Sequence, residues 1–360
     1  MTAGAIAAGE SQTNASPEAV IATATEAIGR DPGNARNYYT RGKAYRRLGR
    51  LGLALADINK AIGIDPKQSE WYADRSGLYL GLSAEDMYLG STNSHFHQDK
   101  SDLALADINK AIELDSRNPR VYVQRGLIQA TYGKFEQGQA DYQKAIELAP
   151  TNSRSYRDRS QFYGLWSAQA MMSGDCDRAQ VTDKLAEADM NRAVELAPGD
   201  IDTLLFRAEF YSSRNWERAL ADYRKVIALD PSSAFPHRRL ATMYSVRGEN
   251  SLALAEFNKA VEVEPGKSMS YCERGGYYSR QGKHELALAD LNKAIEIDPK
   301  SGMAYAERAK LKAMQGQYDS ALGDWTTAAT LVPDSKYYQR ERDKCELRAK
   351  GKQSLTKGKP

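Results

Sequence analysis

Leu53-Ala54-Leu55-Ala56-Asp57-Ile58-Asn59-Lys60-Ala61-Ile62 is the stretch that decides the fold, because the chain repeats it. Residues 103–112 copy it letter for letter, and residues 286–295 differ from it only at Leu291. Looser copies lie at residues 138–146, 186–194, 219–227, 253–261 and 321–329. Self-similarity at a fixed period is typical of repeat architectures, in which each unit packs only against its neighbours and the core grows lengthwise.

A proline or serine closes each copy at a constant offset and fixes the period. Successive closing residues are separated by 50, 34, 48, 33, 34, 34 and 34 residues, so the basic unit has 34. The second unit therefore carries 50 − 34 = 16 extra residues and the fourth carries 48 − 34 = 14. The closing residues are Pro66, Ser116, Pro150, Pro198, Pro231, Pro265, Pro299 and Pro333, with Pro32 one period before the first.

Each unit is predicted to consist of two helices joined by a turn. We number the closing proline as position 32 and count the second helix back from it and the first helix forward from the previous proline. Positions 8 and 20 always hold Gly, Ser or Ala, which let two helices approach closely. Large side chains at position 24 fill the space between helices: Ile58, Ile108, Tyr142, Met190, Tyr223, Phe257, Leu291 and Trp325.

This pattern resembles the tetratricopeptide repeat, a 34-residue helix–turn–helix with small residues, aromatics and a closing proline at these places. The resemblance covers roughly Ala35 to Pro333. It implies an all-α fold, a right-handed superhelical solenoid of helix–turn–helix tetratricopeptide repeats. We expect residues 16–333 to form this solenoid as one half repeat followed by eight repeats, with insertions near 82–101 and 166–181.

The two insertions differ in composition. The first includes Ser91-Thr92-Asn93-Ser94, which is typical of a loop. In the second, Trp166 to Met172 should continue the first helix, and Arg178 to Leu185 should extend the second helix backward. Seven residues on each arm would project about 10 Å beyond the neighbouring units. Insertions in repeat arrays map to one face and are often functional.

The two ends are expected to differ from the repeats. We expect a disordered N-terminus at residues 1–15, a C-terminal capping helix at 334–350 and a disordered basic tail at 351–360. From Ser335 to Pro360 there are nine Lys or Arg and three Asp or Glu, a net of +6. The whole chain carries +3, so the rest carries −3, which argues against a generally basic nucleic-acid scaffold.

No pattern in the sequence predicts catalysis, a cofactor or a metal site. Phosphate-binding glycine loops, zinc-ligand spacings and nucleophile elbows are missing. His95 and His97 form the only metal-like cluster, and without a fixed third ligand a solvated loop is the better interpretation. No apolar run approaches the length of a membrane span, and three scattered cysteines favour a reducing, cytoplasmic location.

One arginine in nearly every unit could be mistaken for a phosphate-binding array. It recurs at position 7, but an acidic residue recurs with the same period at position 23. A buried arginine needs a partner, so we predict structural ion pairs such as Arg125 with Asp141. The position-7 arginines are Arg41, Arg75, Arg125, Arg159, Arg207, Arg274 and Arg308.

The resemblance implies that the first helices line a groove through positions 2, 5, 6, 9, 12 and 13. No Asp or Glu lies between Pro32 and Asp57, so the first helix of the first unit should carry an unmatched basic stripe. We predict a non-catalytic protein–protein interaction scaffold that binds an extended, acidic peptide in this groove. The alternative is nucleic-acid or acidic-membrane association through the basic C-terminal segment. The candidate groove residues are Arg36, Tyr39, Lys43, Arg46, Arg47, Arg120, Arg157 and Arg238.

Overall fold

The structure is a computed structural model that describes residues 15–88 and 94–357. Over these residues it contains eighteen helices, α1 to α18, and no strand. The chain divides into two compact bodies, a first body up to Ala197 and a second body from Pro198. This confirms the predicted all-α solenoid of helix–turn–helix repeats.

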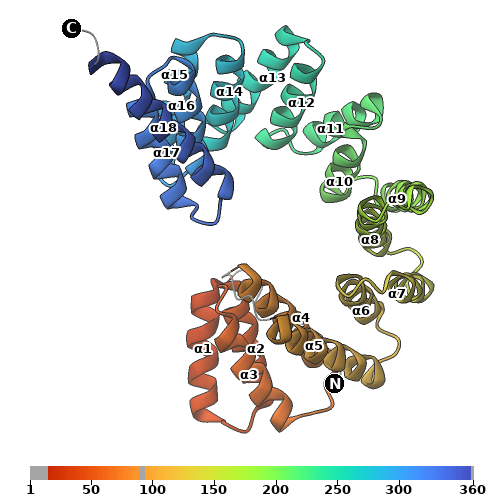
Figure 1. Ribbon diagram of the computed structural model, residues 1–360. Coiled ribbons are helices and arrows are strands. Elements are labelled where there is room, and N and C mark those ends of the chain that lie inside the picture. Colours follow the sequence, from red (N-terminus) through yellow and green to blue (C-terminus); the bar gives the residue numbers. More distant parts are fainter. Residues whose placement is uncertain (1–14, 89–93, 358–360) are drawn as a thin grey trace. The chain divides into compact units, whose positions relative to one another are not determined.

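The first body holds the half repeat and repeats 1 to 4. The two helices of each repeat pack side by side as a hairpin (Figure 1). The first helices of successive repeats also contact one another, α4 with α6 and α6 with α8. The helices are α1 (Pro17–Arg30), α2 (Ala35–Arg47), α3 (Leu51–Ile64), α4 (Ser69–Tyr88), α5 (Ser94–Leu114), α6 (Pro119–Thr131), α7 (Phe135–Leu148), α8 (Ser153–Met172) and α9 (Cys176–Leu196).

The second body holds repeats 5 to 8 and a final helix. Here too the first helices contact one another, α12 with α14 and α14 with α16. The helices are α10 (Ile201–Ser212), α11 (Trp216–Leu229), α12 (Ala234–Val246), α13 (Asn250–Val263), α14 (Ser268–Arg280), α15 (His284–Ile297), α16 (Gly302–Met314), α17 (Tyr318–Leu331) and α18 (Lys336–Lys357).

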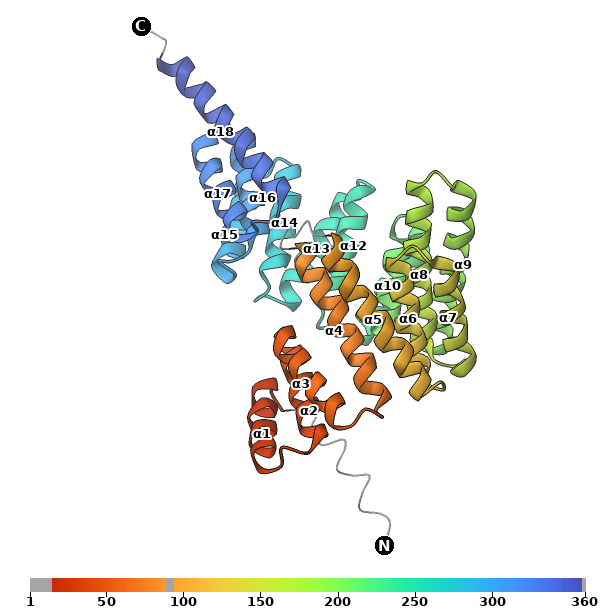
Figure 2. The same ribbon diagram turned by 60° about the horizontal axis from the view of Figure 1, so that its bottom comes forward.

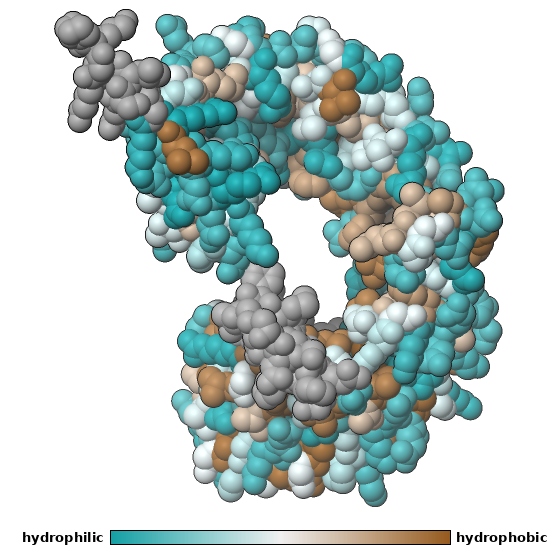
Figure 3. All heavy atoms as spheres, in the orientation of Figure 1, coloured by the Kyte–Doolittle hydropathy of each residue, from teal (hydrophilic) through white to brown (hydrophobic). Residues whose placement is uncertain are grey.

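Tight turns join the helices of most hairpins and set their antiparallel pairing. Each turn has a glycine with positive φ, between 70° and 81°, a conformation that a side chain disfavours. Alanines, Phe, Tyr and Leu between the helices form the core. On the face seen in Figure 3, hydrophilic residues therefore predominate and hydrophobic ones form small separate patches. The turn glycines are Gly49, Gly133, Gly174, Gly248, Gly282 and Gly316.

Both insertions lengthen helices. Helices α8 and α9 have 20 and 21 residues, compared with 13 and 14 for α2 and α3. In the first insertion α4 and α5 also have 20 and 21 residues, so the described part of this insertion is helical, and of the predicted loop at 91–94 only Ser94 is described. The segment from Leu82 to Tyr88 contains no Gly or Pro to stop the helix. Ser94 begins α5, and residues 91–93 lie outside the described residues.

The last helix runs further than expected. Helix α18 continues to Lys357, so residues 351–357, expected as a disordered tail, are helical. Gly351 costs a helix only about 1 kcal/mol, and no proline follows before Pro360. Residues 1–14 and 358–360 lie outside the described residues. Among the helices that the structure describes, none is both long enough and apolar enough to cross a membrane.

Helices α6 and α7 approach unusually closely, which gives a testable prediction. A Cβ atom added to Gly138 would lie 2.7 Å from the Phe162 ring and 2.9 Å from the Gly126 carbonyl oxygen. Because Phe162 is fully buried, the ring cannot move aside freely. Gly138→Ala should therefore lower the free energy of unfolding by about 1–3 kcal/mol, although other repeats have alanine at this position.

The matched control for this prediction is Gly164→Ala on α8. No atom lies within 4 Å of a Cβ added there. This change should stabilise the protein by about 0.5–1 kcal/mol, since alanine is the better helix former. Urea unfolding of the two variants measures the difference. Equal stabilities would contradict the close packing of α6 against α7.

Candidate functional site

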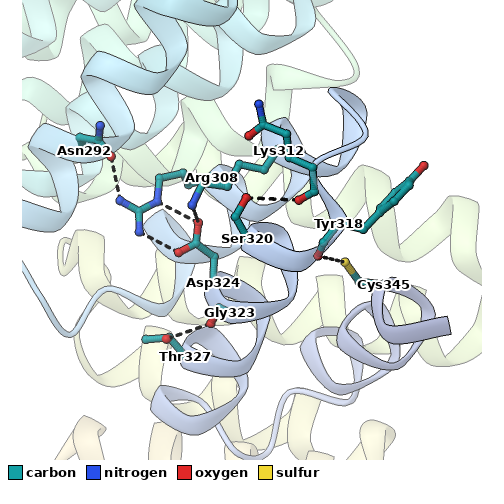
Figure 4. Close-up of polar contacts among 10 residues, drawn as sticks. Asn292, Arg308, Lys312, Tyr318, Ser320, Gly323, Asp324, Thr327 and Cys345 are labelled. Carbon is teal, nitrogen blue, oxygen red and sulfur yellow. Dashed lines mark hydrogen bonds and ion pairs between the residues drawn. The ribbon is translucent and has the colours of Figure 1, made fainter. Parts of the chain in front are cut away.

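The repeated arginine is a structural element. Arg308 Nε and Nη2 donate to the two carboxylate oxygens of Asp324 at 2.9 and 2.7 Å. Its Nη1 donates to Asn292 of the preceding repeat at 2.7 Å (Figure 4). Burial alone would raise the pKa of Asp324, but hydrogen bonds from Arg308 and Lys312 outweigh it and lower this pKa. The carboxylate therefore stays charged and paired.

The same arrangement recurs along both bodies and confirms the predicted structural ion pairs. The third hydrogen bond was not predicted from the sequence. It explains why asparagine recurs in the repeated stretch: Asn59, for example, accepts from Arg75 at 2.7 Å. Within each body these arginines thus join their own second helix to the preceding repeat, as the bonds of Arg41, Arg75, Arg125, Arg159, Arg274 and Arg308 show. The pairs are Arg41–Asp57, Arg75–Asp107, Arg125–Asp141, Arg159–Asp189, Arg207–Asp222, Arg274–Asp290 and Arg308–Asp324.

We call the side chains at positions 2, 5, 6, 9, 12 and 13 of the first helices the first-helix face. Tyr39 on this face is only 6% exposed and stacks on Trp71 with ring centroids 5.3 Å apart. Its hydroxyl donates to Asp74 at 2.7 Å, and Arg46 donates to the same carboxylate at 3.1 Å. Burial, followed by the charge of Asp74, raises the pKa of the Tyr39 hydroxyl. Tyr39 therefore positions Asp74 and Arg46.

The expectation of an unmatched basic stripe is wrong for part of α2. Lys43 Nζ lies 3.4 Å from Glu70 and 5.2 Å from the centre of the Tyr39 ring. Glu70 and Asp74 both come from α4, the first helix of the next repeat. Acidic partners were missed because they are 27 and 28 residues away from Lys43 and Arg46 in the sequence.

Three of the predicted cations remain open to solvent. Arg36 and Arg47 on α2 and Arg120 on α6 are exposed. None of them forms an ion pair with a side chain that the structure describes. Arg157 on α8 differs, because its side chain is only 12% exposed and its Nε lies 3.8 Å from the Asp158 carboxylate. Burial raises the pKa of the Asp158 carboxyl, although Arg157 and Arg154 lower it in part.

The two bodies differ in the charge of this face. In the first body it carries seven cations and three acids, a net of +4. In the second body four cations and four acids cancel. Arg238 lies in the second body and pairs with Glu273 at 3.0 Å.

The second body also has partly exposed apolar side chains on this face that were not predicted from the sequence. They lie at position 2 of repeats 6 to 8: Phe235, Met269 and Met303.

Comparison with known families explains the repeat. Family models described as tetratricopeptide repeat match residues 35–68, 119–152, 268–301 and 291–323. The first three stretches each contain one hairpin, α2–α3, α6–α7 and α14–α15. The chain is a tetratricopeptide repeat protein. A search of curated proteins gave no significant match for the sequence.

Solved structures resemble this tetratricopeptide repeat protein in fold alone. A monomeric mutant of IFIT1 with Gppp-AAAA is 17% identical, with 88% of this chain and 71% of that chain covered and a TM-score of 0.50. The human IFIT1 dimer with PPP-AAAA is 14% identical, with 88% and 69% covered and a TM-score of 0.50. A tetratricopeptide repeat protein from Parabacteroides merdae is 18% identical, with 76% and 98% covered and a TM-score of 0.49.

Tetratricopeptide repeat proteins are in general interaction scaffolds without catalytic activity. Among the side chains that the structure describes, no three His, Cys, Asp or Glu residues come together as a metal site. The side chains of His95 and His97 lie outside this set.

In the sixth repeat, which has no arginine at position 7, a histidine pairs with the position-23 acid instead. His237 Nδ1 lies 2.7 Å from Glu256.

Proposed function

We propose that this tetratricopeptide repeat protein is a non-catalytic binding scaffold whose first body takes an extended acidic peptide segment on its first-helix face. The observation that carries the proposal is the net charge of +4 on that face. Repeat proteins commonly use the extended surface formed by successive repeats for binding. The neutral face of the second body does not offer the same attraction.

The exposed cations would make the contacts. Arginine presents a planar fork of donors that matches a carboxylate, so Arg36, Arg47 and Arg120 suit Asp and Glu side chains. Each exposed pair contributes only about 0.2–1 kcal/mol, so affinity requires several of them along the segment. Lys43 and Arg46 are already paired with Glu70 and Asp74, and they would orient the surface and add positive potential.

The test uses the full chain and a fluorescein-labelled peptide of eight alternating Asp and Glu residues. The variant is Arg36→Glu with Arg47→Glu, because both side chains are exposed and their reversal breaks no described ion pair. We expect fluorescence anisotropy to show saturable binding that the variant weakens about tenfold or more, since attraction becomes repulsion. Its melting temperature should stay within about 2 °C of the unmodified chain.

A charge-matched control separates this site from nonspecific attraction. Arg280→Glu with Lys336→Glu reverses two exposed cations in the second body and should change the dissociation constant less than about threefold. Deleting residues 351–360 should leave binding intact. If the deletion abolishes binding and the Arg36 and Arg47 reversal does not, the basic C-terminal segment is the binding element and this proposal is wrong.

A further inference from the structure

The long hairpin of repeat 4 leaves part of its wall uncovered. Helices α8 and α9 have 20 and 21 residues, whereas α6 and α7 of repeat 3 have 13 and 14. The α8–α9 pair therefore extends about 10 Å beyond its neighbour (Figure 2). Trp166 on α8 stacks on Phe135, the first residue of α7, with centroids 5.4 Å apart and planes within 10°. Repeat 3 therefore covers the α8–α9 hairpin as far as Trp166.

A pocket of about 440 Å³ lies where this cover ends. Gln139 of α7 and Trp166 of α8 contribute to it, and α9 supplies most of the remaining wall. Val181 is 56% exposed and Leu185 is 37% exposed, although both are apolar. Thr182 between them is buried and bonds to the backbone oxygen atoms of Arg178 and Ala179, so it closes the floor. The volume suits one or two bulky side chains.

The rim of the pocket is acidic. Arg178 is its only lining cation among the described residues, and the guanidinium lies 5.4 Å from the centre of the Trp166 ring. Two carboxylates already neutralise it, Glu136 at 3.1 Å and Asp175 at 3.3 Å. Asp177 also lines the pocket and is exposed. The lining residues Asp175, Asp177 and Arg178 carry a net charge of −1 beside an apolar wall, and the adjacent Glu136 adds a further negative charge.

We propose that this pocket binds a partner segment in which a bulky apolar side chain is flanked by lysine or arginine. The apolar side chain would lie against Val181 and Leu185, and burying their exposed surface stabilises the complex. The flanking cations would meet Asp177, Glu136 and Asp175. This site is separate from the first-helix face and prefers the opposite charge, so the scaffold has two binding surfaces with different partners.

The experiment measures, by fluorescence anisotropy, the binding of a fluorescein-labelled peptide, Lys-Lys-Leu-Phe-Lys-Lys, to the full chain. Val181→Arg removes apolar wall and adds a like charge, so it should weaken binding about tenfold or more. Leu165→Arg is the matched control. Leu165 on α8 is 52% exposed and does not line the pocket, so the same added charge should change binding less than about threefold.

Two further measurements make the result decisive. The charge-reversed peptide Glu-Glu-Leu-Phe-Glu-Glu should not compete for the pocket. Val181→Arg should leave binding of the eight-residue acidic peptide unchanged, so failure of either site can be told from failure of the other. Equal weakening by Val181→Arg and Leu165→Arg would show a general charge effect. That result, or lack of saturable binding by the unmodified chain, would overturn the proposal.

Discussion

Arg125→Ala is expected to lower the free energy of unfolding by about 3 kcal/mol. Arg125 Nε and Nη2 donate to Asp141 at 2.8 and 2.6 Å, and Nη1 donates to Asn109 at 2.9 Å. The Asp141 side chain is only 7% exposed, so truncating the arginine leaves a buried charge without its main partner. Loss of the Asn109 bond also loosens the contact between repeats 2 and 3. Chemical denaturation measures the change.

A double-mutant cycle and a surface pair complete this test. Asp141→Ala combined with Arg125→Ala should cost clearly less than the two single changes added together. The control is Lys144→Ala, which breaks an exposed pair with Glu147 at 3.5 Å on the same helix. It should cost less than about 0.5 kcal/mol. Additive effects in the cycle would contradict direct pairing of Arg125 with Asp141.

Cys176 should react with iodoacetamide at least about a thousandfold faster than Cys272 in the folded protein. Cys176 is exposed at the start of α9, whereas Cys272 on α14 has no exposed surface. Burial, and then the charges of Glu307 and Glu273, raise the pKa of the Cys272 thiol to about 12. At pH 8 very little reactive thiolate is present there. Cys345 is 4% exposed, and burial also raises its pKa.

Mass spectrometry should therefore find one label for each native chain and three after denaturation. Cys176→Ser should remove the native label. The raised pKa also predicts a pH dependence. The Cys272 thiol has a pKa of 9.0 when exposed in the unfolded chain and about 12 in the folded protein. The unfolded state therefore releases this proton first, and the free energy of unfolding falls as pH rises between these two values. Rapid native labelling of Cys272 would contradict the packing of α14 in the second body.

Repetition made the fold and the arginine pairs predictable. Eight copies of one spacing determined where the helices lie and which positions touch within a hairpin. Arg125 and Asp141 could be paired from sequence because both recur with the same period and a buried guanidinium needs a carboxylate. The sequence also predicted that residues 178–185 belong to the second helix of repeat 4, because they contain no Gly or Pro, and α9 includes them.

Contacts between repeats could not be predicted in the same way. The partners of Lys43 and Arg46 lie on α4, and this pairing depends on how one hairpin stacks on the next. The burial of Tyr39 against Trp71 follows from the same stacking. The pocket beside Val181 depends on a difference in length between neighbouring hairpins. A pattern within one repeat does not contain that information.

Photo-crosslinking tests the central claim most directly, the binding of an acidic segment by the first-helix face of the first body. The eight-residue acidic peptide would carry a diazirine at its centre and be irradiated with the full chain at a concentration near its dissociation constant. Proteolysis and mass spectrometry then locate the adducts. We predict adducts on α2 and α6, near Arg47 and Arg120. Adducts confined to the second body, α18 included, would contradict the account.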